Sequence, residues 1–131
     1  MREIKFRVWD PAEKQMCPVI VADFQDIKAK VFCRLPKSGA QGIFSADLMQ
    51  YTGVKDKNGV EIYEGDIIRG RTGRYQVDCV VRWSMGNCGF IAEPTIMERT
   101  YLCLNPGSTK SYEVIGNIYE NPELVSDETD T

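Results

Sequence analysis

The middle of the chain, residues 48–68, reads Leu48-Met49-Gln50-Tyr51-Thr52-Gly53-Val54-Lys55-Asp56-Lys57-Asn58-Gly59-Val60-Glu61-Ile62-Tyr63-Glu64-Gly65-Asp66-Ile67-Ile68. Two apolar, β-favouring segments are joined here by Asn58-Gly59, a pair typical of a type I′ hairpin turn because both residues tolerate a positive φ. Gly65 predicts a second turn at positive φ, where the carboxylate of Asp66 accepts a nearby backbone N–H. The stretch therefore specifies tight β structure, and it specifies no reaction.

Two further blocks, at the ends of the chain, accompany this stretch. They read Arg2-Glu3-Ile4-Lys5-Phe6-Arg7-Val8-Trp9-Asp10 and Val114-Ile115-Gly116-Asn117-Ile118-Tyr119-Glu120-Asn121-Pro122-Glu123-Leu124. Together with Tyr51-Thr52-Gly53 and the segment from Lys55 to Ile67, they resemble the YopX family of phage and prophage proteins. The resemblance implies a β-rich, SH3-barrel-like fold, a phage or prophage origin and a cytoplasmic setting. It transfers no catalytic or binding residue, because the family consists of small proteins of unknown function.

Length and composition indicate an ordinary soluble domain. The 131 residues suit one domain, or one with an appendage, and 43% of them are hydrophobic and 27% charged. We expect no membrane span and no export signal, and therefore a cytoplasmic protein. Residues 112–131 hold six acids and no base, which leaves 16 basic and 13 acidic groups, a net charge of +3, on residues 1–111. That charge is too small to predict nucleic-acid binding without a clustered patch.

The cysteines and the lack of histidine argue against a metal, a cofactor and catalysis. The chain has no histidine, which removes the commonest zinc ligand and general base. Its five cysteines are scattered without CxxC spacing, so we expect core thiols, with Cys88 in a turn as the exposed one. The acidic residues that come closest to suggesting a metal or acid–base site are Glu61, Glu64 and Asp66. Glu61 and Glu64 should face opposite ways on a strand, and Asp66 already serves a turn.

The N-terminal part predicts three strands. Residues 4–9 and 16–24 form a hairpin around a turn at Asp10–Lys14, and Pro18 predicts an edge position near the start of the second strand. Alternation predicts a strand over residues 27–35, and four turn formers make 36–42 a loop and a domain boundary. Residues 43–52 suit a strand or a short helix capped by Ser45.

The C-terminal part predicts further short strands. A glycine-punctuated basic loop at 69–74 precedes a strand over 75–83, a turn at 84–89 and a strand at 90–92, while 93–104 suits strand or helix. Residues 112–119 close the sheet. The predicted fold is mainly β, an SH3-like partly open barrel or roll with few or no helices. Its parts are an N-terminal β segment packed on the barrel (1–42), the barrel (43–121) and an acidic flexible tail (122–131).

Two basic groups are the candidate binding residues. The first is the loop with Arg69, Arg71 and Arg74 followed by Tyr75, which could hold phosphates and stack a base. The ordinary alternative is a solvated loop whose arginines meet Asp66 or Asp78. The second is a strip on one strand face, which is either a binding surface or an ordinary exposed face; it consists of Lys28, Lys30, Phe32 and Arg34.

We therefore expect a phage or prophage accessory protein without enzymatic activity. It would bind a protein partner or a second copy of itself through sheet edges and exposed aromatic residues. The alternative is a nucleic-acid-binding protein that uses the two basic groups. No cofactor, metal or membrane partner is expected.

Overall fold

The computed structural model describes residues 3–23, 29–72, 74–95 and 102–125. The chain divides into two compact units, Met1–Tyr51 and Thr52–Thr131. Within the described residues strands are the main regular structure, and two short 3₁₀ helices are the only helical elements. The prediction of a mainly β protein is confirmed.

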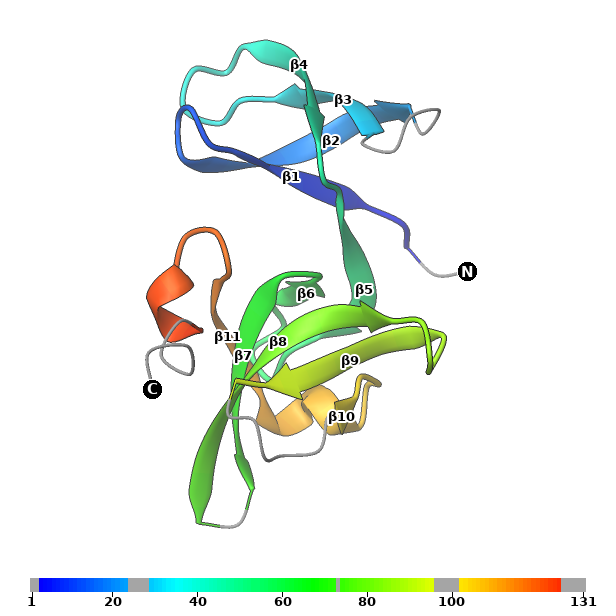
Figure 1. The fold of residues 1–131 in the computed structure, drawn as a ribbon, viewed down its shortest axis with the longest axis vertical. Helices are drawn as coiled ribbons and strands as arrows, with labels where there is room; N and C mark the ends of the chain where they lie inside the picture. Colours follow the sequence, from blue (N-terminus) through cyan, green and yellow to red (C-terminus); the bar gives the residue numbers. More distant parts are fainter. Residues whose placement is uncertain (1–2, 24–28, 73, 96–101, 126–131) are drawn as a thin grey trace. The chain divides into compact units, whose positions relative to one another are not determined.

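The first unit is an antiparallel sheet of consecutive strands (Figure 1). The strand order is β4-β3-β2-β1-β5-β6; β5 continues into the second unit, to which its neighbour β6 (Glu61–Tyr63) belongs. Residues 43–52, where a helix was one alternative, fall in two strands that are joined at residues 47–48. The bounds are β1 (Phe6–Asp10), β2 (Gln15–Asp23), β3 (Ala29–Arg34), β4 (Gln41–Ala46) and β5 (Met49–Lys55).

Two expectations for the first unit have different outcomes. The loop at 36–42 lies within the β3–β4 hairpin, and the division into units falls later, after Tyr51, because β5 pairs with β1 through Met49 and Gln50. β2 as a whole lies between β1 and β3, but pairing with β3 begins at Val19, so Pro18 pairs with β1 alone and the edge position inferred from it holds for the start of the strand. The β2–β3 register shifts between Val19 and Val21, and irregular pairing of this kind tolerates a proline nearby.

The core of the first unit follows from strand alternation. Val8, Cys17, Val31 and Cys33 are buried together, each on an inward position of its strand. The predicted turn between β1 and β2 is confirmed. One oxygen of Asp10 accepts the backbone N–H of Ala12 at 3.0 Å, as expected for an aspartate that starts a turn.

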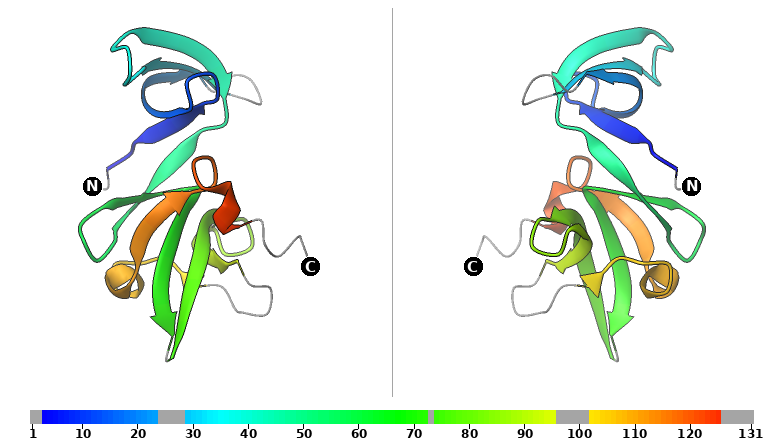
Figure 2. Two further views of the ribbon diagram at one scale, coloured as in Figure 1. Left: turned by 90° about the vertical axis from the view of Figure 1, so that its left-hand side faces the viewer. Right: turned by 90° about the vertical axis from the view of Figure 1, so that its right-hand side faces the viewer.

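The second unit contains the β5–β6 hairpin and a five-stranded antiparallel sheet. The order in that sheet is β10-β9-β8-β7-β11, and Figure 2 shows β11 beside the long β7–β8 hairpin. These strands do not form a closed barrel. The bounds are β6 (Glu61–Tyr63), β7 (Asp66–Thr72), β8 (Tyr75–Ser84), β9 (Gly89–Pro94), β10 (Leu102–Cys103), β11 (Glu113–Asn117) and the 3₁₀ helices η1 (Ser108–Ser111) and η2 (Pro122–Leu124).

The two turns of the central stretch have different outcomes. Gly65 has φ +84°, and Asp66 accepts the N–H of Tyr63 at 2.8 Å, so that turn is confirmed. The type I′ geometry is wrong, because Gly59 has φ +83° while Asn58 does not take a positive φ. Asp56 decides this: its Oδ1 accepts the N–H of Asn58 at 2.8 Å, which holds the turn in a different conformation.

The main core cluster of the second unit lies on one face of its sheet. Ile68, Cys79, Val81 and Ala92 are buried there together with Ile62 of β6 and with Tyr112, which precedes β11. Ile67, Val80 and Ile91 are buried on the other face. Gly70 has no side chain because the ring of Tyr112 occupies that space: a Cβ would lie 2.5–2.6 Å from the ring carbons. Most of the predicted tail, residues 126–131, lies outside the described residues, and its start forms η2.

Candidate binding surface

The predicted basic loop is mostly strand. Arg69 and Arg71 belong to β7, whose pairing with β8 continues to Thr72, and only Arg74 lies in the turn before β8. The glycines that suggested a loop did not end the strand, because Gly70 fits under Tyr112 inside the sheet. Arg71 and Arg74 are exposed, whereas the side chain of Tyr75 lies outside the described part of the chain.

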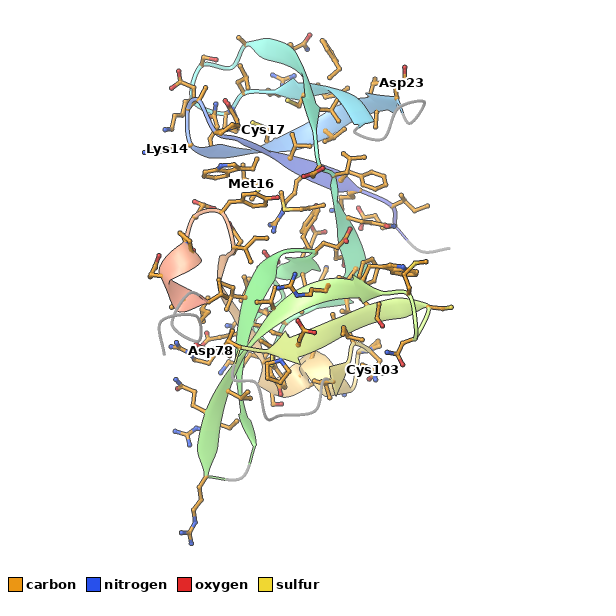
Figure 3. All side chains as sticks on the ribbon, in the orientation of Figure 1. Lys14, Met16, Cys17, Asp23, Asp78 and Cys103 are labelled. Atoms are coloured by element: carbon orange, nitrogen blue, oxygen red, sulfur yellow. The ribbon has the colours of Figure 1, made fainter. Side chains whose placement is uncertain are left out.

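Arg69 is held by a carboxylate on the neighbouring strand. It lies opposite Asp78, which Figure 3 labels on β8, and donates from Nε to Oδ1 at 2.8 Å and from Nη2 to Oδ2 at 3.0 Å. This side-chain hydrogen bond raises the pKa of the Arg69 guanidinium above its ordinary value. A forked pair of this kind occupies two of the guanidinium donors that would bind a phosphate. Only Arg71 and Arg74 of the three arginines are exposed cations.

The second predicted strip lies on β3. Arg34 is exposed and Phe32 is half-buried, while the side chain of Lys30 and the whole of Lys28 lie outside the described residues. The interior position of β3, between β2 and β4, is incompatible with an edge contact through this strand. The two predicted basic groups belong to different units of the chain.

Buried carboxylates in both units accept hydrogen bonds from the backbone. Asp66 is 2% exposed, and its carboxylate accepts a hydrogen bond from the backbone N–H of Tyr63. Asp56 is 7% exposed, and its carboxylate accepts hydrogen bonds from the backbone N–H groups of Val60 and Val114. No group of three or more cysteine, aspartate or glutamate side chains within the described ranges could hold a metal ion. These acids shape the chain locally, as turn and strand anchors.

The thiols divide into buried and exposed groups. Burial raises the pKa of Cys17 and of Cys79 to about 11, and it also raises that of Cys33. Cys88 is exposed, as expected from its turn, and so is Cys103 on β10 (Figure 3). A high pKa leaves almost no thiolate at neutral pH, so the buried thiols are weak nucleophiles.

Sequence analysis missed an apolar surface at the end of the β8–β9 hairpin. Trp83 and Phe90 lie opposite each other, with ring centroids 5.1 Å apart and ring planes at 78°. Trp83 is 49% exposed, and Met85 in the following turn is 83% exposed. We call Trp83, Met85 and Phe90 the Trp83 surface.

This surface is the uncovered end of the core face of the sheet. Cys79 and Val81 are buried, and Trp83 is the next residue on the same side of β8. The core ends before it, so the aromatic pair extends the apolar face into solvent. The signal available in the sequence was the position of Trp83 directly before a turn.

The comparisons with known proteins agree with this architecture. A family model described as YopX protein matches residues 5–126. The chain belongs to the YopX family. It is similar to protein EF1440 from Enterococcus faecalis, known from a crystal structure, with 29% sequence identity, a TM-score of 0.60, and coverage of 95% of this chain and 99% of that one. No curated protein matches.

The described part of this YopX-family chain presents surfaces suited to contact. Trp83 and Met85 are the exposed apolar residues of the Trp83 surface, and Ile20 and Val21 on β2 are further exposed apolar residues. Arg71 and Arg74 are exposed cations. In the ranges that the structure describes, no helix has the length and apolar character needed to cross a bilayer. The arrangement can offer an apolar, aromatic contact and a weak cationic one.

Proposed function

We propose that this YopX-family protein is a non-enzymatic module that binds another protein, and that the Trp83 surface is its contact. The observation that carries the proposal is the half-exposed Trp83, paired with Phe90 beside the exposed Met85. Tryptophan and methionine are enriched in the centres of protein interfaces, and tryptophan is prominent among the residues that dominate binding energy. Large apolar groups gathered at a surface mark such sites.

The placement of the aromatic pair supports a preformed contact. Trp83 and Phe90 are held by two paired strands, and their edge-to-face packing restrains both rings. Binding to such a surface costs little ordering of side chains. The non-enzymatic part of the proposal draws support from the three buried aspartates, Asp10, Asp56 and Asp66, since each one accepts hydrogen bonds from the backbone.

The test is capture of partners from a bacterial lysate with the tagged chain and with Trp83→Ala. The matched control is Val60→Ala, which trims another exposed apolar side chain of the same unit, 48% exposed. A partner bound through the Trp83 surface should bind Trp83→Ala about 30-fold more weakly, as expected for loss of a dominant interface residue. Val60→Ala should retain it. Partners captured equally by all three proteins would refute the proposed contact.

Nucleic-acid binding is the second candidate, and the exposed Arg71 and Arg74 favour it. Affinity for a DNA or RNA oligonucleotide should fall steeply with salt, and Arg71→Gln/Arg74→Gln should reduce that salt dependence. Asp78→Asn would weaken the hold on Arg69 and should increase the affinity. A chain that shows no salt-dependent binding at low ionic strength would end this alternative.

Three finer features belong to the same proposal. We infer an SH3-like, partly open arrangement for residues 43–121, supported by the five-stranded antiparallel sheet and the β5–β6 hairpin. The family resemblance supports a phage or prophage origin and a cytoplasmic setting. A protein of that kind would act by contacting a component of the bacterial cell or of the phage.

A further inference from the structure

The outer edge of β4 differs from the other sheet edges of the described chain. The strands at the ends of the strand orders are β4, β6, β10 and β11. β6 and β10 are only three and two residues long, and the pairing of β11 shifts register between Val114 and Gly116. Short strands and bulges are the usual devices that protect an edge against further pairing. β4 has neither of them.

β4 is six residues long and regular. It pairs with β3 at all six positions, from Arg34 opposite Gln41 to Ala29 opposite Ala46, without a register shift. Its sequence, Gln41-Gly42-Ile43-Phe44-Ser45-Ala46, contains no proline and no charged residue. Lysine and proline are the residues that most often block an exposed edge. Among the described strands none pairs with the side of β4 that points away from β3, so its outward backbone groups can pair with another strand.

We propose that two copies of this protein pair through β4, antiparallel and across a two-fold axis, so that the first-unit sheets of both copies become continuous. A two-fold contact places β4 opposite β4 of the second copy. Such a contact requires that like charges do not meet, and β4 fulfils this because it has no charged residue. Regular antiparallel geometry then satisfies the outward N–H and C=O groups of both copies. The contact uses no residue of the Trp83 surface and is independent of that proposal.

Charge placed on the edge tests the contact in the full chain. A pairing of one short strand belongs to the class of weak interfaces, so the dimerisation constant is measured by analytical ultracentrifugation up to millimolar concentration. Gln41→Lys/Ser45→Lys should weaken the dimer by about tenfold or more, because four positive charges then lie along the two paired strands and repel each other. The control Ala12→Lys/Glu13→Gln changes the net charge by the same two units in the β1–β2 turn and should leave the dimerisation constant unchanged.

Amide hydrogen exchange locates the contact. The proposal requires that amides within Gln41–Ala46 become more protected as protein concentration rises, and that Gln41→Lys/Ser45→Lys abolishes this dependence. A chain that stays monomeric at millimolar concentration would overturn the proposal. So would a dimer that only Trp83→Ala weakens, which would support the Trp83 surface as a self-contact. β4 amides protected equally at all concentrations would mean that the same molecule covers the edge, and would also overturn it.

Discussion

Removal of the Asp56 carboxylate should destabilise the second unit more than any other single loss of a polar group there. Asp56 follows β5 and is 7% exposed. Its Oδ1 accepts the backbone N–H groups of Asn58 at 2.8 Å and Val60 at 2.9 Å, and its Oδ2 accepts that of Val114 at 2.9 Å. One side chain thus joins the β5–β6 turn to β11, which lies far along the chain.

The expected magnitude follows from these three hydrogen bonds. A hydrogen bond to a charged group contributes about 1.5–3 kcal/mol, and a buried donor left without a partner costs a similar amount. All three hydrogen bonds are only partly buried, so water can replace part of the loss. Asp56→Ala should therefore lower the free energy of unfolding by about 2–4 kcal/mol, a large share of the 5–15 kcal/mol typical of a domain.

Asp56→Asn separates the turn from the connection to β11. The amide oxygen can still accept the N–H groups of Asn58 and Val60, but the NH₂ group then faces the N–H of Val114. We expect about half of the loss seen for Asp56→Ala, with faster hydrogen exchange at Val114 and unchanged exchange in the turn. Urea unfolding and amide exchange measure both effects. The control Asp47→Ala removes an exposed aspartate and should change stability by less than about 0.5 kcal/mol.

Two results would refute this reasoning. Asp56→Ala could unfold at the same urea concentration as the unaltered chain, which would mean that water replaces all three hydrogen bonds. Alternatively, Asp56→Asn could lose as much stability as Asp56→Ala, with fast exchange in the turn as well. In that case the negative charge, and not the geometry of the acceptor oxygens, would hold the segment.

Three further predictions concern packing, acid stability and thiol reactivity. Gly70→Ala should cost about 1–3 kcal/mol in urea unfolding because its Cβ would strike the Tyr112 ring, whereas Gly86→Ala meets nothing within 4 Å and should be nearly neutral. The pKa of Asp10 is lowered from 3.8, chiefly by the hydrogen bond from Gln15. The ionised Asp10 carboxylate therefore stabilises the fold fully above about pH 4, and this stabilisation is lost as the pH falls through the lowered pKa. In Asp10→Asn the free energy of unfolding, measured in urea at several pH values, should fall less over the same acidic range. Iodoacetamide should modify two cysteines of the native protein and all five after unfolding, by mass spectrometry, and a third modified native thiol would contradict the burial of the others.

The sequence alone predicted most of the strands and the positions of the turns. Alternation placed β1, β3 and β8, and the Asn58-Gly59 and Gly65 positions located the turns of the central stretch. These features depend on residues that are neighbours in the chain, since backbone preferences and the two-residue period of a strand act over short distances. The same reasoning identified Asp66 as a turn anchor.

The tertiary structure decided which segments meet and which faces are covered. Pairing with β1 over its first half and with β3 over its second half makes β2 an interior strand, and packing of Tyr112 against Gly70 extends β7 through a segment that reads as a loop. The register of β7 against β8 places Asp78 beside Arg69, and the end of the core leaves Trp83 in solvent. Each of these outcomes depends on contacts between residues distant in sequence. Local preferences carry no information about such contacts, because the same strand pattern is compatible with several partners and several covered faces.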